Sequence, residues 1–218
     1  MKVAIVVFPG TNCDIDTFRA CEELGWKPEY VWHDETLTKD YQIVFLPGGF
    51  SYGDYIRSGR LAKFSPIMQS IVSYVNNKRG MVVGICNGFQ ILCECGLLPG
   101  VLTDNISNRF ICKETELVLN DKDTTGTIKL PIAHGEGRYY ADDETLESIE
   151  DSGMVFLRYE NNPNGSVHDI AGLYDKERMI MAMMPHPERA VFKDIGGIDG
   201  NNIFKIIERD VKNAFSYI

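Results

Sequence analysis

The sequence lacks the features that would assign it to several common classes of protein. It has no apolar run near the roughly 18 residues that a membrane-spanning helix requires. No run of lysine and arginine is longer than the pair Lys78-Arg79, and the formal net charge is −9, so no basic surface for a nucleic acid is expected. Low-complexity tracts are absent as well. These absences favour a soluble globular protein with neither a membrane nor a nucleic acid as its partner.

Motifs that would hold a nucleotide or a metal ion are also missing. Neither phosphate-binding pattern, G-x-x-x-x-G-K-[ST] or G-x-G-x-x-G, occurs, so no cofactor is expected in this chain. The six cysteines form no paired framework, and Cys93-x-Cys95 has no second pair to complete a zinc site, so no metal is expected. The N-terminal apolar run ends at Pro9-Gly10 without a cleavage site, which is typical of a first strand rather than a signal peptide. We therefore expect reduced thiols in a cytoplasmic protein.

Short apolar runs rich in valine and isoleucine predict the central strands of a sheet. They occupy residues 2–8, 42–47 and 81–85, and each is closed by glycine, proline or a polar turn. From about residue 116 the pattern changes to strand-like runs with few helical intervals, which predicts antiparallel additions to the sheet. These later runs are 115–120, 127–134, 154–159, 169–175 and 179–184.

Three segments have helical periodicity. The first stops at Gly25, the second begins with Ser65 and Pro66 and is over by Gly80, and the third closes the chain. The expected buried positions are Ile15, Phe18, Cys21 and Leu24 in the first helix, Met68, Ile71, Val72 and Val75 in the second, and Ile203, Phe204, Ile206, Ile207, Val211, Ala214 and Phe215 in the third.

The order strand, helix, strand, strand, helix, strand predicts an α/β fold of one domain, residues 1–218. We expect a three-layer, flavodoxin-like arrangement, with a largely parallel sheet, helices on both of its faces and added antiparallel strands. Ligands of such sheets bind beyond the carboxyl ends of the strands. The turns at residues 8–14, 47–54 and 84–90 lie at those ends and are where chemistry is expected.

Cys86 stands between Gly84 and Gly88, after a predicted strand and before a predicted helix. This is the thiol counterpart of the nucleophile elbow, in which a tight turn lifts the side chain above the sheet. Helix N-termini favour the thiolate. An isolated intracellular cysteine is more often a small core residue, and this is the role expected for the other five. Cys13 stays open, because it lies in the first of the ligand-facing turns.

A cysteine nucleophile needs a base and a group that orients it. His186 follows the strand-like run 179–184 and is flanked by prolines, which favour an extended chain that turns His186 and Glu188 to one side. An oxyanion also needs N–H donors, which we assign to the backbones of Asn87 and Gly49. Among the other histidines, His134 is a possible ligand-facing residue, while His33 and His168 are expected to be polar surface or loop residues.

The motifs together resemble the class I, or triad, glutamine amidotransferases. The resemblance rests on PGG in the predicted oxyanion strand, G-x-C-x-G-x-Q at the elbow and P-H-P-E near the C-terminus. The segments FPGTNCD, GGFSYGDYIRSG, ICNGFQILCECGLLPG, HGEGRYY, NPNGSVHDIAG and MMPHPERA extend it along nearly the whole chain, toward the glutaminase subunits of purine biosynthesis. It implies that Cys86 attacks the side-chain amide of glutamine, that His186 passes a proton to departing ammonia, and that Glu188 orients His186.

The same resemblance implies the remaining site residues and the partners. Gln90 would hold the substrate, as would Phe110 and the turn at His134. A large synthetase subunit would use the ammonia together with ATP and Mg²⁺, and a small third subunit is commonly present.

Two other classes of protein remain possible. A cysteine-elbow hydrolase or redox sensor would share residues 81–92 but would need neither Gln90 nor P-H-P-E. A non-catalytic subunit would be expected to lose Cys86 or His186.

Overall fold

The structure, a computed structural model, describes residues 1–195 and 197–215. Its strands are β1 (Lys2–Val7), β2 (Lys27–Trp32), β3 (Ile43–Leu46), β4 (Met81–Ile85), β5 (Val101–Thr103), β6 (Ile111–Asn120), β7 (Thr125–His134), β8 (Arg138–Tyr140), β9 (Val155–Tyr159), β10 (Ile170–Asp175) and β11 (Ile180–Met183). Its α-helices are α1 (Asp14–Glu23), α2 (Pro66–Asn76), α3 (Asn87–Glu94), α4 (Asp143–Asp151) and α5 (Gly200–Ala214).

A nine-stranded mixed sheet forms the centre of the molecule, in the order β2-β1-β3-β4-β11-β10-β9-β6-β7. Neighbouring strands are parallel from β2 to β11 and antiparallel from β11 to β7. The order β2-β1-β3-β4 is that of the flavodoxin-like fold. The predicted fold class, a largely parallel sheet with antiparallel additions, is therefore confirmed.

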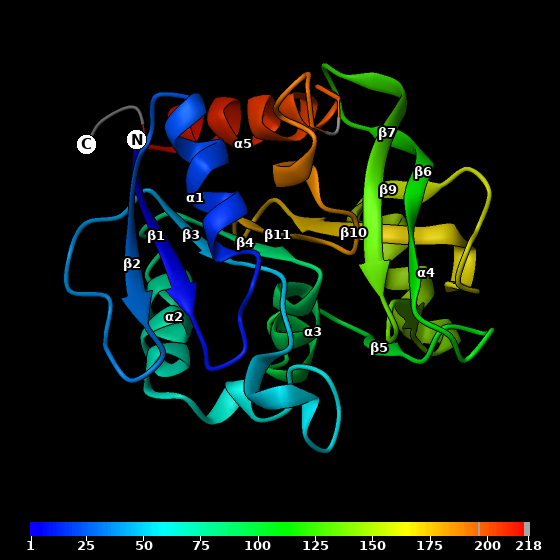
Figure 1. The fold of residues 1–218 in the computed structure, drawn as a ribbon, viewed down its shortest axis with the longest axis horizontal. Helices are drawn as coiled ribbons and strands as arrows, with labels where there is room; N and C mark the ends of the chain where they lie inside the picture. The colour runs from blue at the N-terminus through cyan, green and yellow to red at the C-terminus, as the bar shows by residue number, and fades with distance from the viewer. Residues whose placement is uncertain (196, 216–218) are drawn as a thin grey trace.

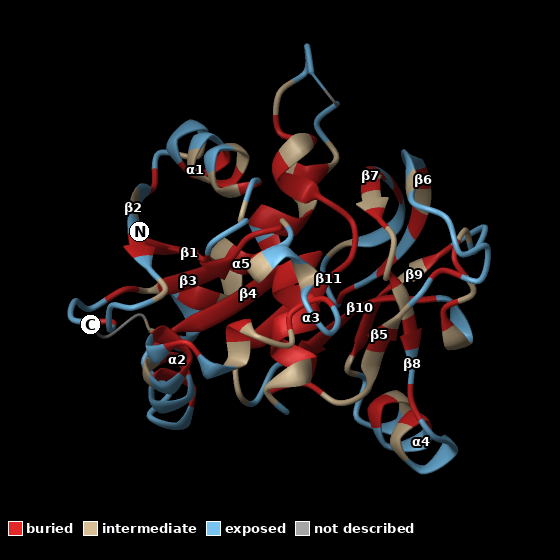
Figure 2. Cartoon of the chain, turned by 60° about the horizontal axis from the view of Figure 1, so that its bottom comes forward, coloured by how far each residue is buried: buried red, intermediate tan, exposed pale blue. Residues whose placement is uncertain are grey.

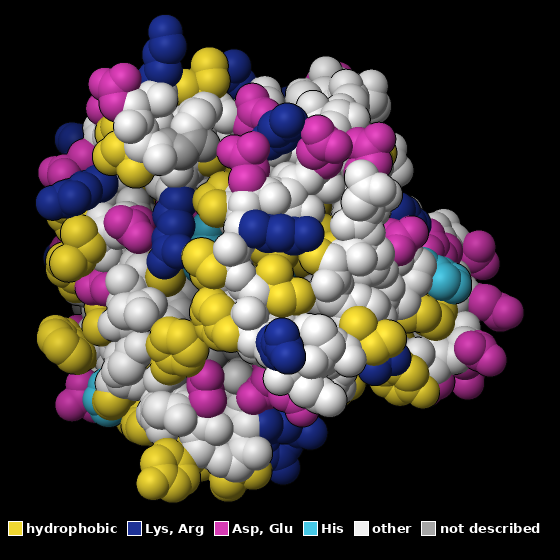
Figure 3. Space-filling view, turned by 45° about the vertical axis from the view of Figure 1, so that its right-hand side comes forward, with side chains coloured by type: hydrophobic (Ala, Val, Ile, Leu, Met, Phe, Trp, Pro, Cys, Tyr) yellow, Lys and Arg dark blue, Asp and Glu magenta, His cyan; other side chains and the backbone are white. Residues whose placement is uncertain are grey.

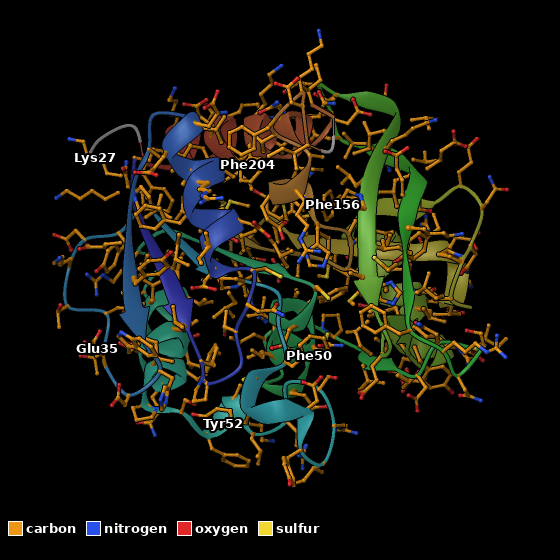
Figure 4. The ribbon with its side chains drawn as sticks, in the orientation of Figure 1. Lys27, Glu35, Phe50, Tyr52, Phe156 and Phe204 are labelled. Atoms are coloured by element: carbon orange, nitrogen blue, oxygen red, sulfur yellow. The ribbon has the colours of Figure 1, made fainter. Side chains whose placement is uncertain are left out.

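Helices cover both faces of the parallel part of the sheet. Figure 1 shows α1 and α5 on one face and α2 and α3 on the other. Because both faces are covered, the strands between them are apolar without alternation, and all five residues of β4 are buried. Buried residues accordingly gather in the central strands and on the inner sides of the helices (Figure 2). Phe204 points from α5 toward the sheet, 6.2 Å from Phe45 between ring centroids (Figure 4).

Several local predictions differ from the structure. Helix α4 was not predicted, because only Leu146 and Ile149 on it are buried and the apolar pattern is too sparse. Ile15 was expected to be buried and is 54% exposed, since α1 packs through Thr17, Ala20 and Cys21 instead. The buried stripes of α2 and α5 are as predicted in their main positions, but Val72 and Ala214 lie on the exposed side.

Charges of both signs are interspersed on the face drawn in Figure 3. Among the described residues, no helix is long and apolar enough to cross a membrane. The single domain spanning residues 1–218 stays a prediction, and residues 196 and 216–218 of it lie outside the described residues.

Candidate active site

Cys86 occupies a strained turn between β4 and α3. Its φ of 51° and ψ of −102° are unfavourable for a residue with a side chain, and it is the residue that precedes the first turn of α3. The flanking glycines permit this turn, because a Cβ at Gly88 would lie 1.9 Å from the carbonyl oxygen of Leu46. A Cβ at Gly84 would lie 2.8 Å from that of Gly88. The predicted elbow geometry is therefore present.

The elbow is fixed to the neighbouring strands. The backbone N–H of Cys86 donates to the carbonyl of Met183 at 2.8 Å, which ties the turn to the end of β11. The Sγ atom lies 3.7 Å from the carbonyl oxygen of Ala133 on β7. Cys86 is 6% exposed, and Sγ is held at the positive end of α3. A thiol in this position is accessible to a small substrate.

His186 and Glu188 form a buried pair. The His186 Nδ1 and Glu188 Oε1 atoms are 2.6 Å apart, and both residues are 1% exposed. The contact between the two side chains is as predicted, but the backbone conformation is not. Pro187 begins a 3-10 turn, Pro187–Arg189, instead of continuing an extended chain. The backbone N–H of His186 donates to the carbonyl of Pro131 at 2.8 Å. These contacts fix the imidazole at the carboxyl end of β11, beside the end of β4.

His186 holds its proton strongly. Burial lowers the pKa of its imidazole, but the negative charges of Glu188 and then of Cys86 outweigh burial and raise that pKa well above the usual 6.5. These charges favour the imidazolium over the neutral ring. The imidazolium can stabilise negative charge on Sγ and can give a proton to a leaving group.

The predicted oxyanion turn lies beside the elbow. Gly49 has a φ of 153°, and a Cβ there would lie 2.7 Å from Cα of Thr11, so no larger residue fits. The side chain of Asn87 joins the turn to the elbow helix, because its Oδ1 accepts from the Ser51 N–H at 3.2 Å. Its Nδ2 donates to Gln90 Oε1 at 2.9 Å. The backbone N–H of Asn87 opens α3 and has no acceptor within that helix.

A cavity of about 140 Å³ brings together five of the predicted site residues, whereas Asn87, His186 and Glu188 do not line it. It is lined by Gly49, Phe50, Asp54, Ser58, Cys86, Gln90, Asp104, Phe110, Ala133, His134, Gly135 and Glu136. Phe110 is half exposed at its edge, 6.4 Å from Phe50 between ring centroids, and Phe50 is labelled in Figure 4. The amide of Gln90 is already engaged, since Nε2 donates to the carbonyl of Glu136 at 2.6 Å. Gln90 therefore supports the wall of the cavity.

The sequence reasoning missed the acidic wall of this cavity. Asp54, Asp104 and Glu136 line it, and none of its described lining residues is lysine or arginine. Asp54 Oδ1 is buried without a hydrogen-bond partner among the described residues, and burial raises the pKa of Asp54 to about 6. Its φ of 53° is a further sign of a constrained residue. The signal available in the sequence was its place in the ligand-facing turn 47–54.

Cys13 lies behind the imidazole. Its Sγ accepts from Arg189 Nη2 at 3.0 Å. A Cβ at Gly48 would lie 2.8 Å from His186 Cε1 and 2.9 Å from Cys13 Sγ, which places both side chains against one glycine. Donor atoms of Cys13, His186 and Glu188 lie within 4.8 Å of one another. Because Nδ1 of His186 is already bonded to Glu188 and a guanidinium faces Sγ, this group is poorly suited to a cation.

The remaining cysteines and histidines largely match their predicted roles. Burial raises the pKa of Cys21 to about 12, and Cys93 is buried as well. Cys112 is exposed on β6, so its assignment to the core was wrong. His33 is partly buried and contacts Tyr52, and the exposed His168 lies 3.2 Å from a carboxylate of α4. Neither histidine lines the cavity with Cys86.

The chain is similar to proteins of one family along most of its length. The model of the CobB/CobQ-like glutamine amidotransferase domain matches residues 1–196. A protein from Prochlorococcus marinus, named phosphoribosylformylglycinamidine synthase subunit PurQ, is 48% identical over 216 residues, 95% of this chain and 99% of the relative. A protein of the same name from Salinibacter ruber is 48% identical over 222 residues, 94% of each chain.

Solved structures agree with this assignment. A chain of the structure described as PurLQS from Thermotoga maritima is 42% identical with a TM-score of 0.86, and the match covers 95% of this chain and 97% of that one. A glutamine amidotransferase from Thermotoga maritima has a TM-score of 0.57 at 15% identity, covering 98% of this chain and 93% of that one, which supports the fold alone. The chain therefore belongs to the CobB/CobQ-like glutamine amidotransferase family and, within it, is of the same type as the PurQ subunits.

Proposed function

We propose that this amidotransferase is the glutaminase subunit of phosphoribosylformylglycinamidine synthase, in purine biosynthesis. It hydrolyses glutamine and delivers ammonia to an ATP-dependent synthetase subunit that converts formylglycinamide ribonucleotide to formylglycinamidine ribonucleotide. The observation that carries the glutaminase activity is the buried His186–Glu188 pair, 2.6 Å apart, which follows β11 beside the strand that leads into the Cys86 elbow. The choice of acceptor is supported by two relatives, each 48% identical and named as PurQ subunits of that synthase.

The first half-reaction forms a thioester. Cys86 Sγ bonds to the side-chain carbonyl carbon of glutamine, and the imidazolium of His186 gives its proton to the amide nitrogen as the carbon–nitrogen bond breaks. Ammonia leaves with that proton. Glu188 holds Nδ1–H of His186 at 2.6 Å, so that Nε2 is the nitrogen that exchanges protons.

Water completes the turnover. His186, now neutral, accepts a proton from the water molecule that attacks the thioester. Glutamate is then released, and the Cys86 thiolate is restored beside the imidazolium. In both halves negative charge develops on the carbonyl oxygen. The backbone N–H groups of Asn87 and Gly49 are the donors that we assign to it, and one such donor typically contributes about 10² to 10³ in rate.

The partners follow from what the ammonia must do next. Free ammonia would be protonated and lost in bulk water, so a synthetase has to receive it directly. We assign this step to a large synthetase subunit, which would bind ATP and Mg²⁺, and we expect a small third subunit in the same complex. A relative with 42% identity belongs to a structure described as PurLQS, which supports such an assembly. The chain itself would need no cofactor, and its place would be the cytoplasm.

The two alternative classes account for fewer observations. A redox sensor built on the elbow has no need of the buried carboxylate on His186. A general cysteine hydrolase has no need of the bonds that fix Gln90 to Asn87 and Glu136. A non-catalytic subunit would not need a charged, fully buried histidine beside a strained cysteine.

Replacing the nucleophile tests the proposal. In the complex reconstituted with the synthetase subunit, Cys86→Ala should abolish glutamine-dependent synthesis while ammonia-dependent synthesis continues. Cys93→Ser is the matched control, because Cys93 lies on the same helix and is only 8% exposed but is outside the cavity, and it should keep both activities. Glutamine-dependent synthesis that survives in Cys86→Ala would refute the role of this thiol.

A further inference from the structure

We propose that Asn105 holds His134 in one tautomer, so that Nε2 of His134 accepts a hydrogen bond from the substrate's carboxamide N–H and from ammonia as it departs. His134 thereby becomes a group that touches the reacting nitrogen, and Asn105 a positioning residue. The inference rests on the proposed glutaminase function and assigns an atom-level role within that site.

The hydrogen bonds of Asn105 leave a single orientation of its amide. Asn105 is fully buried, and its Nδ2 donates to two carbonyl oxygens, those of Arg109 and His134, each at 2.8 Å. Its Oδ1 accepts from the backbone N–H of Gly137 at 3.2 Å. If the amide were rotated by 180°, its NH₂ group would face the N–H of Gly137, and its oxygen would face the carbonyl oxygens of Arg109 and His134. Oδ1 is therefore the atom that faces His134.

This orientation decides where the imidazole carries its proton. Asn105 Oδ1 lies 3.0 Å from His134 Nδ1, and an amide oxygen can only accept. Nδ1 must therefore be the protonated nitrogen, and Nε2 has a free lone pair. Burial, and next the positive charge of His186, lower the pKa of His134 to about 4, so this neutral form is the one present at working pH.

The ring is held with its Nδ1 edge against the turn that follows β7. A Cβ at Gly137 would lie 2.1 Å from Nδ1 and 2.3 Å from Cε1 of His134, so only glycine allows this packing. His134 is 2% exposed and lines the cavity that also holds Cys86. Its Nε2 is buried and has no hydrogen-bond partner among the described residues. An unpaired buried acceptor is costly unless a ligand supplies the donor.

Two observations place this acceptor at the reacting end of the substrate. Cys86 Sγ lies 3.7 Å from the carbonyl oxygen of Ala133, the residue next to His134. The positive charge of His186, the residue that donates to the leaving nitrogen, also lowers the pKa of His134, after the larger effect of burial. The donor that arrives there with glutamine is the carboxamide N–H.

The interaction strengthens as the reaction proceeds. The amide nitrogen is a neutral donor in the bound substrate and becomes ammonium-like when His186 protonates it. Hydrogen bonds from a charged donor are roughly twice as strong as neutral ones, so the gain falls on the transition state. Accepting one N–H also turns the nitrogen lone pair toward the proton of His186. Loss of this acceptor should cost about 10- to 100-fold in kcat/KM.

The test compares two substrates in one variant. Glutamine and the γ-methyl ester of glutamate form the same thioester with Cys86, but the ester has no N–H at the leaving group. His134→Leu in the assembled complex should lower kcat/KM about 10- to 100-fold with glutamine and less than about threefold with the ester. His134→Gln, whose amide oxygen can accept, should recover part of the loss. His168→Leu is the control for an exposed histidine and should change neither rate.

Other outcomes overturn the proposal in distinguishable ways. Equal losses with both substrates would mean that His134 is only structural. A loss that persists with the ester but disappears with glutaramate, which lacks the α-ammonium group, would mean that Nε2 accepts from that group instead. Wild-type complex that releases no glutamate from glutamine would refute the proposed function and the inference with it. Two-bond ¹⁵N–¹H correlation spectra, assigned with His134→Gln, should show a protonated Nδ1 and a bare Nε2, and the opposite tautomer would refute the role of Asn105.

Discussion

Glu188→Gln isolates the contribution of a single buried charge to the site. The carboxylate oxygen lies 2.6 Å from His186 Nδ1, and both residues are 1% exposed, so water can replace little of the interaction. Removing one partner of such a buried pair costs about 3–5 kcal/mol. If that cost falls on the imidazolium that donates to ammonia, kcat falls by about 10² to 10⁴. Loss of the base itself should cost more, on the order of 10⁶ as in serine–histidine–aspartate sites.

The pH dependence of kcat in Glu188→Gln provides a second test of the role of Glu188. In the wild type, burial lowers the pKa of His186 while Glu188 and Cys86 raise it, with a net rise. In Glu188→Gln the negative charge at residue 188 is lost while His186 stays buried, so the pKa of His186 should fall. The alkaline limb of the kcat profile should then move to lower pH. Steady-state glutaminase assays of the wild type, Glu188→Gln and His186→Ala complexes measure both effects. Equal losses in the two variants, or an unmoved alkaline limb, would refute the orienting and charge-stabilising role of Glu188.

Two further predictions concern the acidic wall and the partner. Asp54→Asn should raise KM for glutamine with a smaller change in kcat, because we expect the Asp54 Oδ1, which has no partner among the described residues, to accept from the α-ammonium group of the substrate. An unchanged KM would contradict this role. Burial raises the folded-state pKa of Asp54 to about 6, so ionisation of Asp54 destabilises the fold as the pH rises above the usual pKa of 3.8. The midpoint temperature of unfolding should therefore be higher in the variant than in the wild type at pH 7, and little different at pH 3.5. The lone chain should hydrolyse glutamine more slowly than the complex with ATP and acceptor, by up to about 10² to 10³ in kcat, if the partner aligns the oxyanion turn. Equal kcat in the two states, measured under identical conditions, would contradict this coupling.

The local chemistry of the triad could be predicted from the sequence because each feature depends on adjacent residues. A tight turn requires glycine on both sides of Cys86, and its signature is readable without the fold. The same is true of apolar strands such as β4, which have to be buried on both faces. Helix α4 has only two buried side chains and is stabilised by a capping bond from Thr145 N–H to Asp142 at 2.8 Å, so its apolar pattern gives little signal.

The rest of the site depends on contacts that join distant parts of the chain. Asn105 and His134 are 29 residues apart, and nothing near either residue in the sequence indicates that one fixes the tautomer of the other. Ser58 and Glu136, which close the cavity through a 3.2 Å bond, are 78 residues apart. The extended conformation predicted for Pro187 was wrong, because a proline that opens a turn and one that continues a strand are alike in sequence.

Two buried histidines near one cysteine are driven in opposite directions by their surroundings. His186 has a carboxylate on Nδ1 and the thiol's charge nearby, so its pKa rises and it holds a proton. His134 has a neutral amide oxygen on Nδ1 and the charge of His186 nearby, so its pKa falls and it stays an acceptor. The partner of Nδ1 thus decides whether each ring is an acid or an acceptor. A departing ammonia needs both, because it must gain a proton from one ring while its existing N–H bonds are accepted by another.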